Sequence, residues 1–472
     1  MSIPFTVIIG IETPMMKRYL IIPVFFSFLT LQVNGRLEAA ELGKQAPGVN
    51  AIINVGDPQP PQYYVESIIV EGNDHTDTAI IKRYILIRPG DPLNDNRVEE
   101  SRFRLLSTGW FSEVKAQIRK GTERGKIQVV FSVHERSSIL IDEVHIGFSD
   151  VSHFWAGASV TETNFVGKGF ALTLGVLGGD GFLALRGKFM DPDLAGSEFK
   201  LGGGLFYNDA RERTVDSQTN QLFTIVDYRR VGGDIIFGRR LDNYFHFYMN
   251  YHFEVVDATF RDKTYPPLVF VNNGYSRVSD LTFSVIRDTR NDLWLPSSGW
   301  MFNFSVKLSS QILGSSYDYS KYTLNVEVVL PTVKGHSWKI RGFGGLIQGD
   351  APFFDQYFLG DYFYFVIDKP TLPRVWEINV TSIINYKTLA YSAGMDYAIT
   401  IFSGGKKFYR GFVYAAVLAS GTSTVDEIIK GKGKSGDSIT PVSFDIGLKM
   451  DTSVGVFTFS LAYWTNLLLL LR

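Results

Sequence analysis

Residues that could do metal or nucleophilic chemistry are present in this chain, but not at the spacings that such chemistry needs. The seven histidines are scattered, and none stands in an H-E-x-x-H or comparable ligand pattern. His246 and His252 lie on one face of an alternating segment, which is more simply explained as lumen lining. No G-x-S-x-G sequence offers a serine nucleophile. The chain has no cysteine, which excludes disulfides and thiolate metal sites.

Two glycine-containing segments could suggest phosphate binding, and neither fits. Gly433-Lys434-Ser435 resembles the end of a phosphate-binding loop, but Ile428 stands where the first glycine belongs and no helix is expected to follow. Gly202-Gly203-Gly204 lies in an expected strand, where glycine is better explained by close packing. We therefore expect no catalytic residue, no cofactor and no metal site, and not an enzyme.

The composition favours membrane-crossing strands over a helical fold. The chain combines 45 glycines with 37 phenylalanines and 23 tyrosines, and barrels need glycine at turns and aromatic side chains at the membrane interfaces. The formal net charge of −1 gives no reason to expect nucleic acid as a partner. After the N-terminus, no apolar run reaches the roughly 18 residues that a spanning helix requires.

The N-terminus has the pattern of a secretory signal peptide. Lys17-Arg18 precede an apolar stretch, Tyr19–Leu31, that is too short to span a bilayer, and small residues follow it. We expect residues 1–40 to be the signal peptide, with the true start at Met15 or Met16. An N-terminal membrane anchor is the alternative. Residues 41–62 are expected to be a polar linker.

A small α+β domain is predicted over residues 63–136. Val65–Val70 is expected to be a strand, and Thr76–Ile87 and a second segment capped by Asp95 have helical spacing. Further strands are expected at Val114–Ile118 and Ile127–Val133. The order β-α-α-β-β makes a small sheet with helices on one face.

From Ile139 onward apolar residues recur with period two, which predicts antiparallel strands. Phe245–Val255, Tyr322–Leu330 and Phe457–Tyr463 are the clearest cases. A strand that crosses a bilayer needs about 9–11 residues with an apolar outer face and a polar inner face. We expect residues 139–472 to form an all-β transmembrane antiparallel barrel. An even strand number, about 16, would bring both ends to one side.

A soluble β-sandwich or a repeat protein is the alternative, since alternation marks any half-buried sheet. Three features favour the barrel: the aromatic content, the absence of a fixed repeat period, and the number of consecutive antiparallel segments.

Residues 63–136 resemble a POTRA domain along nearly their whole length. The matching stretches are Ile68–Asn73, Ile87–Pro92, Gly109–Phe111 and Glu135-Arg136. Glycine permits tight turns, asparagine can bond its own backbone, and a phenylalanine supplies core area beneath the helices. The positions that carry the resemblance are Gly72, Asn73, Pro89, Gly90, Gly109 and Phe111.

The barrel half resembles the bacterial surface antigen family, the superfamily of BamA/TamA-like outer-membrane protein assembly factors. Asn164–Phe170 is similar to the family's N-F-x-G-x-G turn, Phe189–Gly196 to its F-x-D-P-x-x-x-G element, and Asp445–Gly455 to its closing hairpin. Arg287–Asp292 is the most specific match. The barrel positions concerned are Asn164, Gly167, Gly169, Asp191, Pro192, Arg287, Asp288, Arg290, Pro296, Gly299, Gly360, Gly447, Asp451 and Gly455.

Two segments depart from the family pattern. Pro352–Gly360 resembles the entry to a long loop that folds back into the barrel, but Asp361–Asp368 lacks the Arg-Gly-Phe tip that contacts acidic groups on the inner wall in the family. The triplets Arg341–Phe343 and Arg410–Phe412 fall within expected strands, so the resemblance assigns them no such role. Family barrels usually end in a strand with a terminal aromatic residue, whereas this sequence ends Leu471-Arg472.

The resemblance implies a non-enzymatic outer-membrane protein, with its POTRA domain in the periplasm, that assembles or inserts outer-membrane proteins. A seam between the first and last barrel strands and a POTRA sheet edge could both template client strands. We expect Ile139–Gly147 and Phe457–Trp464 at the seam, and Val65–Val70 or Ile127–Val133 as the POTRA edge. Implied partners are outer-membrane lipids, unfolded outer-membrane or secreted clients, and periplasmic lipoproteins or chaperones. The alternatives are an export pore for one dedicated secreted protein and a degenerate paralogue with a structural role.

Overall fold

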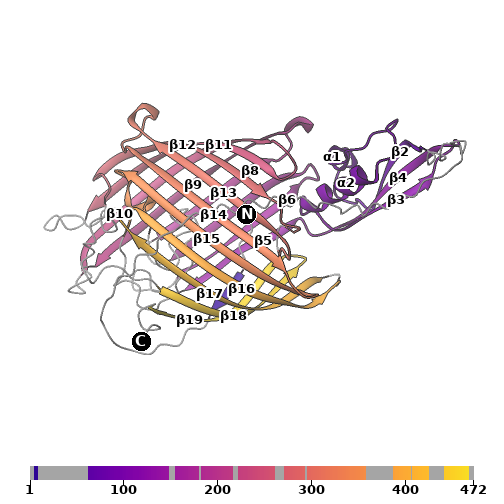
Figure 1. The fold of residues 1–472 in the computed structure, drawn as a ribbon. Coiled ribbons are helices and arrows are strands. Elements are labelled where there is room, and N and C mark those ends of the chain that lie inside the picture. The colour runs from indigo at the N-terminus through magenta and orange to yellow at the C-terminus, as the bar shows by residue number, and fades with distance from the viewer. Residues whose placement is uncertain are drawn as a thin grey trace, which may run out of the picture.

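The computed structural model describes residues 5–8, 62–147, 155–179, 182–215, 222–260, 270–292, 295–357, 386–405, 407–424 and 441–466. A small α/β domain stands at one end of a wide barrel of tilted strands (Figure 1). Several segments named in the sequence analysis lie outside the described residues. They are most of the expected signal peptide and linker, Gly433–Ser435, Gly360–Asp368 and Leu471-Arg472.

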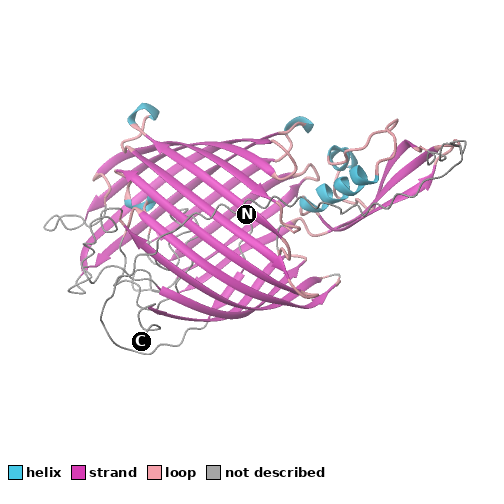
Figure 2. Cartoon of the chain, in the orientation of Figure 1, coloured by secondary structure: helices cyan, strands magenta, loops and turns pink. Residues whose placement is uncertain are grey.

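The small domain follows the predicted order β-α-α-β-β. It contains β2 (Tyr64–Glu71), α1 (Thr78–Arg83), α2 (Asp95–Ser107), β3 (Phe111–Lys120) and β4 (Lys126–Glu135). The three strands form a sheet in the order β2-β4-β3, with β2 parallel and β3 antiparallel to β4. The helices cover one face of this sheet (Figure 2), where Ile81, Leu105, Val129 and Phe131 are fully buried.

Of the two strands proposed as the POTRA edge, one is an edge and the other is not. Val65–Val70 lies in β2, which is an edge together with β3, whereas Ile127–Val133 belongs to β4, the central strand. The expectation that Asp95 caps the second helix was wrong. The cap of α2 is Asn94, whose side chain accepts a hydrogen bond from the Arg97 amide at 3.1 Å, and Asp95 is the first helical residue. Both residue types cap helices well, so the sequence alone could not choose between neighbours.

The barrel consists of antiparallel strands that neighbour one another in chain order. Its strands are β5 (Ile139–Gly147), β6 (Trp155–Phe165), β7 (Phe170–Gly179), β8 (Phe182–Asp191), β9 (Phe199–Val215), β10 (Leu222–Arg240), β11 (Phe245–Phe260), β12 (Gly274–Asp288), β13 (Gly299–Ser309), β14 (Tyr319–Pro331), β15 (His336–Gly349), β16 (Leu389–Ser403), β17 (Phe408–Ser423), β18 (Pro441–Thr452) and β19 (Gly455–Asn466). Three short 3₁₀ turns accompany them: η1 (Leu194–Gly196), η2 (Gln311–Leu313) and η3 (Phe353–Asp355).

Within the described residues the barrel has fifteen antiparallel strands, whereas the sequence analysis expected about sixteen. The two terminal strands of the antiparallel run are β5 and β19, the segments expected to flank the seam. They are joined near the small domain by a hydrogen bond from the Ile141 amide to the Val454 carbonyl, at 2.9 Å. A short segment, β1 (Phe5–Ile8), pairs in parallel with β19. The barrel is therefore nearly closed.

The strands have one apolar outer face and one inner face, as the alternation predicts. On β11, Met249, Tyr251, Phe253 and Val255 are exposed on the outside, whereas Glu254 is buried on the inside. Exposed large apolar side chains occur on the outer face of nearly every strand. Among the residues that the structure describes, no helix is long and apolar enough to cross a membrane.

The barrel interior is filled on the side away from the small domain. Residues Ala351–Tyr357, which follow β15, enter the lumen, and Phe353, Phe354 and Tyr357 are fully buried there. They pack with inward side chains of the barrel strands, among them Tyr228 of β10, and belong to the same cluster as Tyr317, which precedes β14. The lumen is therefore a packed core at this level.

Candidate functional site

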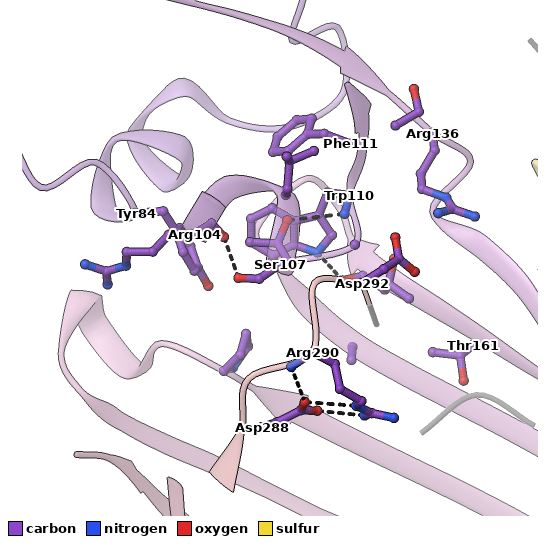
Figure 3. Close-up of a pocket in the computed structure, with 18 of the residues that line it drawn as sticks. Tyr84, Arg104, Ser107, Trp110, Phe111, Arg136, Thr161, Asp288, Arg290 and Asp292 are labelled. Atoms are coloured by element: carbon purple, nitrogen blue, oxygen red, sulfur yellow. Dashed lines mark hydrogen bonds and ion pairs between the residues drawn. The ribbon is translucent and has the colours of Figure 1, made fainter. Parts of the chain in front are cut away.

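The small domain and the barrel enclose a cavity of about 1280 Å³ at the mouth of the lumen. The end of α2 and the start of β3 line one side, and inward side chains of β6 to β9 and of the adjoining turns line the other. Figure 3 shows Arg104, Ser107 and Trp110 of the small domain across from Asp288 and Arg290 of the barrel. We call this space the mouth cavity.

The turn between β6 and β7, which carries the N-F-x-G-x-G motif, binds the small domain directly. The buried Asn164 side chain donates to the Thr76 hydroxyl at 2.8 Å and accepts from the Gly169 amide at 2.7 Å. The backbone carbonyl oxygen of Asn164 lies 3.0 Å from His75 Nε2. The Asp77 amide donates to the Gly167 carbonyl at 3.0 Å. The motif is therefore an interdomain contact as well as a turn.

Glycine is required at both motif positions because the two bodies approach closely there. Gly167 and Gly169 have positive φ angles of 69° and 75°. A methyl group at Gly167 would lie 2.2 Å from the His75 carbonyl oxygen, and one at Gly169 would lie 2.7 Å from the Trp110 ring. Any side chain there would push the small domain off the barrel.

Trp110 is the apolar centre of this interface. The indole N–H donates to the Thr163 carbonyl at 2.9 Å, and the ring is buried between Tyr84 and Phe111. Beside it, Phe103 of α2 packs on Tyr244 of the β10–β11 turn, with ring centroids 6.1 Å apart. The small domain thus rests on several turns of the barrel rather than hanging from one linker.

The chain passes between the two bodies at Glu135 and Arg136. The Glu135 carboxylate accepts hydrogen bonds from the backbone amides of Asp74, His75 and Thr76 at 2.7–3.1 Å. Burial raises the pKa of this carboxyl and these hydrogen bonds lower it; the balance holds its pKa below the usual value. The backbone amide of the next residue, Arg136, still donates to the Trp110 carbonyl at 2.9 Å, whereas its side chain reaches the barrel.

A buried chain of charges runs from Arg136 across the mouth. Arg136 donates to Asp451 at 2.7 Å and to the Thr452 carbonyl at 3.2 Å. The other oxygen of Asp451 accepts from Arg410 at 3.2 Å, and Arg410 also pairs with Asp292 at 2.8 Å. Arg136 and Asp451 are almost fully buried. This network ties the start of β5 to the β18–β19 hairpin and to the β12–β13 turn.

The Arg-Asp-Thr-Arg segment forms a second network beside the first. Arg290 binds Asp288 through two hydrogen bonds of 2.7 and 2.9 Å and reaches Glu327 of β14 at 2.8 Å. Glu327 also pairs with Lys339 of β15 at 2.8 Å. Asp288, Arg290 and Asp292 all line the mouth cavity. The segment therefore holds three neighbouring strands at the mouth.

The structure brings part of the predicted set together. Asn164, Gly167, Gly169, Asp288, Arg290 and Asp451 lie at the junction or its cavity, and Pro192 also lines the cavity. Gly455 lies at the seam, where a methyl group would meet the Ile141 carbonyl at 2.8 Å. Arg287 lies instead over the Trp300 ring, and Gly447 lies within β18. Gly360 is outside the described residues.

The remaining predicted positions shape turns. Gly72, Gly90, Gly109 and Gly299 have positive φ, and a methyl group at Gly72 would lie 2.2 Å from the Val133 carbonyl oxygen. Asn73 donates to Thr76 O and to the Thr78 hydroxyl, both at 2.9 Å. Phe111 is buried in the small-domain core. Asp191 accepts from the Asp193 amide at 3.0 Å. Pro89 and Pro296 stand in the segments that precede Gly90 and Gly299.

Sequence reasoning did not select Thr76 or Arg410, and it quoted Trp110 and Arg136 without giving them a role. Arg410 belongs to one of the two Arg-Gly-Phe triplets, which was the available signal. It lies on β17, as expected, and binds Asp292 and Asp451 at the mouth. The other triplet arginine, Arg341, pairs with Asp396 on the neighbouring strand β16.

Inside the barrel the loop stem is held by a carboxylate. Asp355 pairs with Lys307 at 3.4 Å, its carbonyl accepts from Lys321 at 2.7 Å, and Tyr319 also contacts it. Lys307 reaches Asp280 as well, at 3.3 Å. The stem thus presents an acid to basic wall residues, the reverse of the family arrangement that the resemblance implies.

Comparison with known proteins identifies both bodies. A family model described as a POTRA domain, a surface antigen variable number repeat, matches residues 63–136, and one described as the Omp85 superfamily domain matches residues 164–363. The chain contains a POTRA domain followed by an Omp85 superfamily domain. It is 22% identical over 307 residues to an outer membrane protein assembly factor BamA of Nitratidesulfovibrio vulgaris, a match that covers 63% of this chain. The chain spans about a third, 36%, of the length of that relative.

Solved structures share the fold. BamA from Haemophilus ducreyi lacking POTRA domains 1–3 is 18% identical, with a TM-score of 0.51, and 86% of this chain and 81% of that one are covered. CdiB from Acinetobacter baumannii is 10% identical, with a TM-score of 0.53, covering 85% and 74%. The Omp85 barrel of this chain lies in the outer membrane, with its POTRA domain on the periplasmic side. The apolar outer face of the strands then meets lipid.

Proposed function

We propose that this protein assembles or inserts outer-membrane proteins, without catalysis, by offering strand edges to an unfolded client. The observation that carries the proposal is the position of the POTRA domain. It is fixed to the barrel mouth at the point where the terminal strands β5 and β19 meet. A client held by the POTRA sheet would therefore be delivered beside the seam.

Each end of this route has strand edges that can accept a client. In the POTRA sheet, β3 is an edge strand, and seven of its ten residues are exposed. In the barrel, the described residues of β5 and β19 form no ladder with each other. The segment β1 pairs with β19 over Phe457–Ser460, and the Ile141–Val454 hydrogen bond joins β5 to the turn before β19. The unpaired edge of the barrel sheet is therefore that of β5. Unpaired backbone groups of an edge strand template the addition of another strand. Burial of the client's apolar face in lipid would supply the driving force.

A disulfide across the seam tests the proposal. The chain has no cysteine, so I141C/V454C introduces one reversible link where the two backbones already touch. In proteoliposomes, the protein should accelerate folding of a urea-unfolded eight-stranded client, followed by heat-modifiable gel mobility. Oxidation of the double variant should abolish the acceleration, and reduction should restore it. Each single-cysteine variant should be unaffected by oxidant. Acceleration that persists in the oxidised double variant would rule out insertion through this seam.

Depletion in cells separates this function from the alternatives. Broad loss of unrelated barrel proteins would support assembly. Loss of one secreted protein would support an export pore, as the shared fold with CdiB allows. Loss of neither would favour a structural paralogue. The packed stem at Ala351–Tyr357 in the lumen favours the seam over the lumen as the client route.

A further inference from the structure

Two arginines, one from each domain, line the mouth cavity, and among the described residues neither is in an ion pair with a carboxylate. Arg104 comes from α2 of the POTRA domain and Arg240 from the end of β10, and both line the cavity. Within the part of the chain that the structure describes, neither guanidinium has an ion pair or hydrogen bond. Both side chains are half-buried. Arginines at such positions normally find a carboxylate, because desolvating a lone charge is unfavourable.

The positive charges of these two arginines repel each other. Burial lowers the pKa of Arg104, and the charge of Arg240 lowers it further. Burial also raises the pKa of Asp193, a buried carboxyl in the nearby β8–β9 turn, although both arginines act against this shift. Like charges held together in a partly desolvated space are unfavourable unless an anion joins them. Glu100 and Asp193 attract the Arg104 guanidinium, but neither carboxylate lines the cavity, so it is the arginines that this part of the cavity wall presents.

Other residues that line the cavity add further positive charge. Lys200 of β9 lines it, with its ammonium bonded to the neutral Tyr248 hydroxyl at 3.0 Å, and Arg186 and Lys188 of β8 stand alongside. The carboxylates that line the cavity already bind cations: Asp288 binds Arg290, Asp292 and Asp451 bind Arg410, and Glu113 binds Lys115. We define Arg104, Lys200 and Arg240 as the cationic wall.

We propose that the cationic wall binds the carboxylates of an extended, acidic polypeptide segment that enters the mouth cavity from the periplasm. The volume, about 1280 Å³, exceeds the roughly 300–1,000 Å³ typical of small-molecule pockets, which suits a segment of polymer. The cavity is also lined by the inward-facing Ser159, Thr161 and Thr163, so it lies inside the ring of strands. Lipid meets the outer face. The inference rests on the proposed function, because such a segment would belong to a client.

Peptide binding to the full-length protein in nanodiscs tests the proposal. The probe is a fluorescein-labelled flexible peptide with four glutamates, compared with the same peptide carrying four glutamines. Anisotropy should show the glutamate peptide binding at about 50 mM salt and weakening at about 500 mM, because salt screens charges. The variant R104Q/R240Q should raise its Kd at least tenfold. The glutamine peptide should bind weakly to both proteins.

Matched controls come from neighbouring arginines. Arg102 on α2 pairs with Glu99, and Arg239 on β10 pairs with Glu198; neither lines the cavity. R102Q/R239Q removes the same charge from the same elements and should leave Kd within about twofold. An equal loss in both double variants would show a net-charge effect and overturn the site. Equal competition by short-chain phosphatidic acid would assign the wall to lipid phosphate and overturn the polypeptide. Because no insertion is measured, failure here is separate from failure of the seam experiment.

Discussion

Arg136 binds Asp451 at 2.7 Å, and this pair joins the residue that enters the first barrel strand to the hairpin that begins the last one. One peptide bond away, Glu135 is held by three amides of the POTRA domain. The seam at the mouth and the seating of the POTRA domain therefore depend on adjacent residues.

Loss of the Asp451 charge should loosen the seam. D451N leaves the buried Arg136 and the half-buried Arg410 without their shared carboxylate, and breaking a buried pair costs about 3–5 kcal/mol. The Ile141 amide, bonded to Val454, should exchange with deuterium at least tenfold faster. The control is K168Q, because the Lys168–Asp77 pair is largely exposed and such pairs contribute about 0–1 kcal/mol. Unchanged Ile141 exchange in folded D451N would show that the pair does not hold the seam.

A methyl group at Gly169 should displace the POTRA domain while leaving both bodies folded. The substitution G169A places that group against the Trp110 ring, at a positive φ. The indole bond to Thr163 should break, so Trp110 becomes accessible to quencher. The control is G404A: Gly404 also has positive φ but no atom within 4 Å of the added methyl. Equal quenching in the two variants would mean that backbone strain, not the lost contact, is responsible.

Acid should release the Glu135 contact. The pKa of this carboxyl is depressed in the folded protein, so its contribution is fully present above the unfolded pKa. It is lost as the pH falls through the lower folded value. Protection of the Asp74, His75 and Thr76 amides, corrected for intrinsic exchange, should therefore decline below about pH 4. In E135Q protection should be lower at neutral pH and nearly independent of pH. A wild-type acid decline that survives in E135Q would point to another group.

Two substitutions in the charge network of the lumen, K307M and D355N, should destabilise the barrel to different degrees. K307M leaves Asp280 without its lysine and Asp355 with Lys321 as its remaining lysine, whereas D355N leaves the Lys307–Asp280 pair intact. Removal of one partner of a buried pair costs about 3–5 kcal/mol, so K307M should be the more destabilising change. The temperature at which the barrel loses its folded gel mobility should fall most for K307M. The opposite order would contradict the network described for the loop stem.

The sequence predicted the architecture well and the contacts poorly. Period-two alternation defines strands because each strand is half-exposed, as in Phe245–Val255. The sequence could not predict which POTRA strand lies in the centre of the sheet, because the segments that form β2 and β4 are similarly apolar. Interdomain partners such as Thr76 with Asn164 are 88 residues apart, and nothing in either local pattern points to the other. The motif singled out Gly167 and Gly169, but the reason that glycine stands there is the close approach of the POTRA domain, which the sequence does not show.

The junction between Glu135 and Arg136 contains no spacer. A rotation of the POTRA domain is transmitted to the barrel through this short connection as well as through the turns on which the domain rests. Two glycines inserted between these residues should leave both domains folded, with only the turn contacts to hold the POTRA domain on the barrel. Changes of length in this protein should therefore be tolerated at the barrel end far from the POTRA domain, and selected against at these two positions.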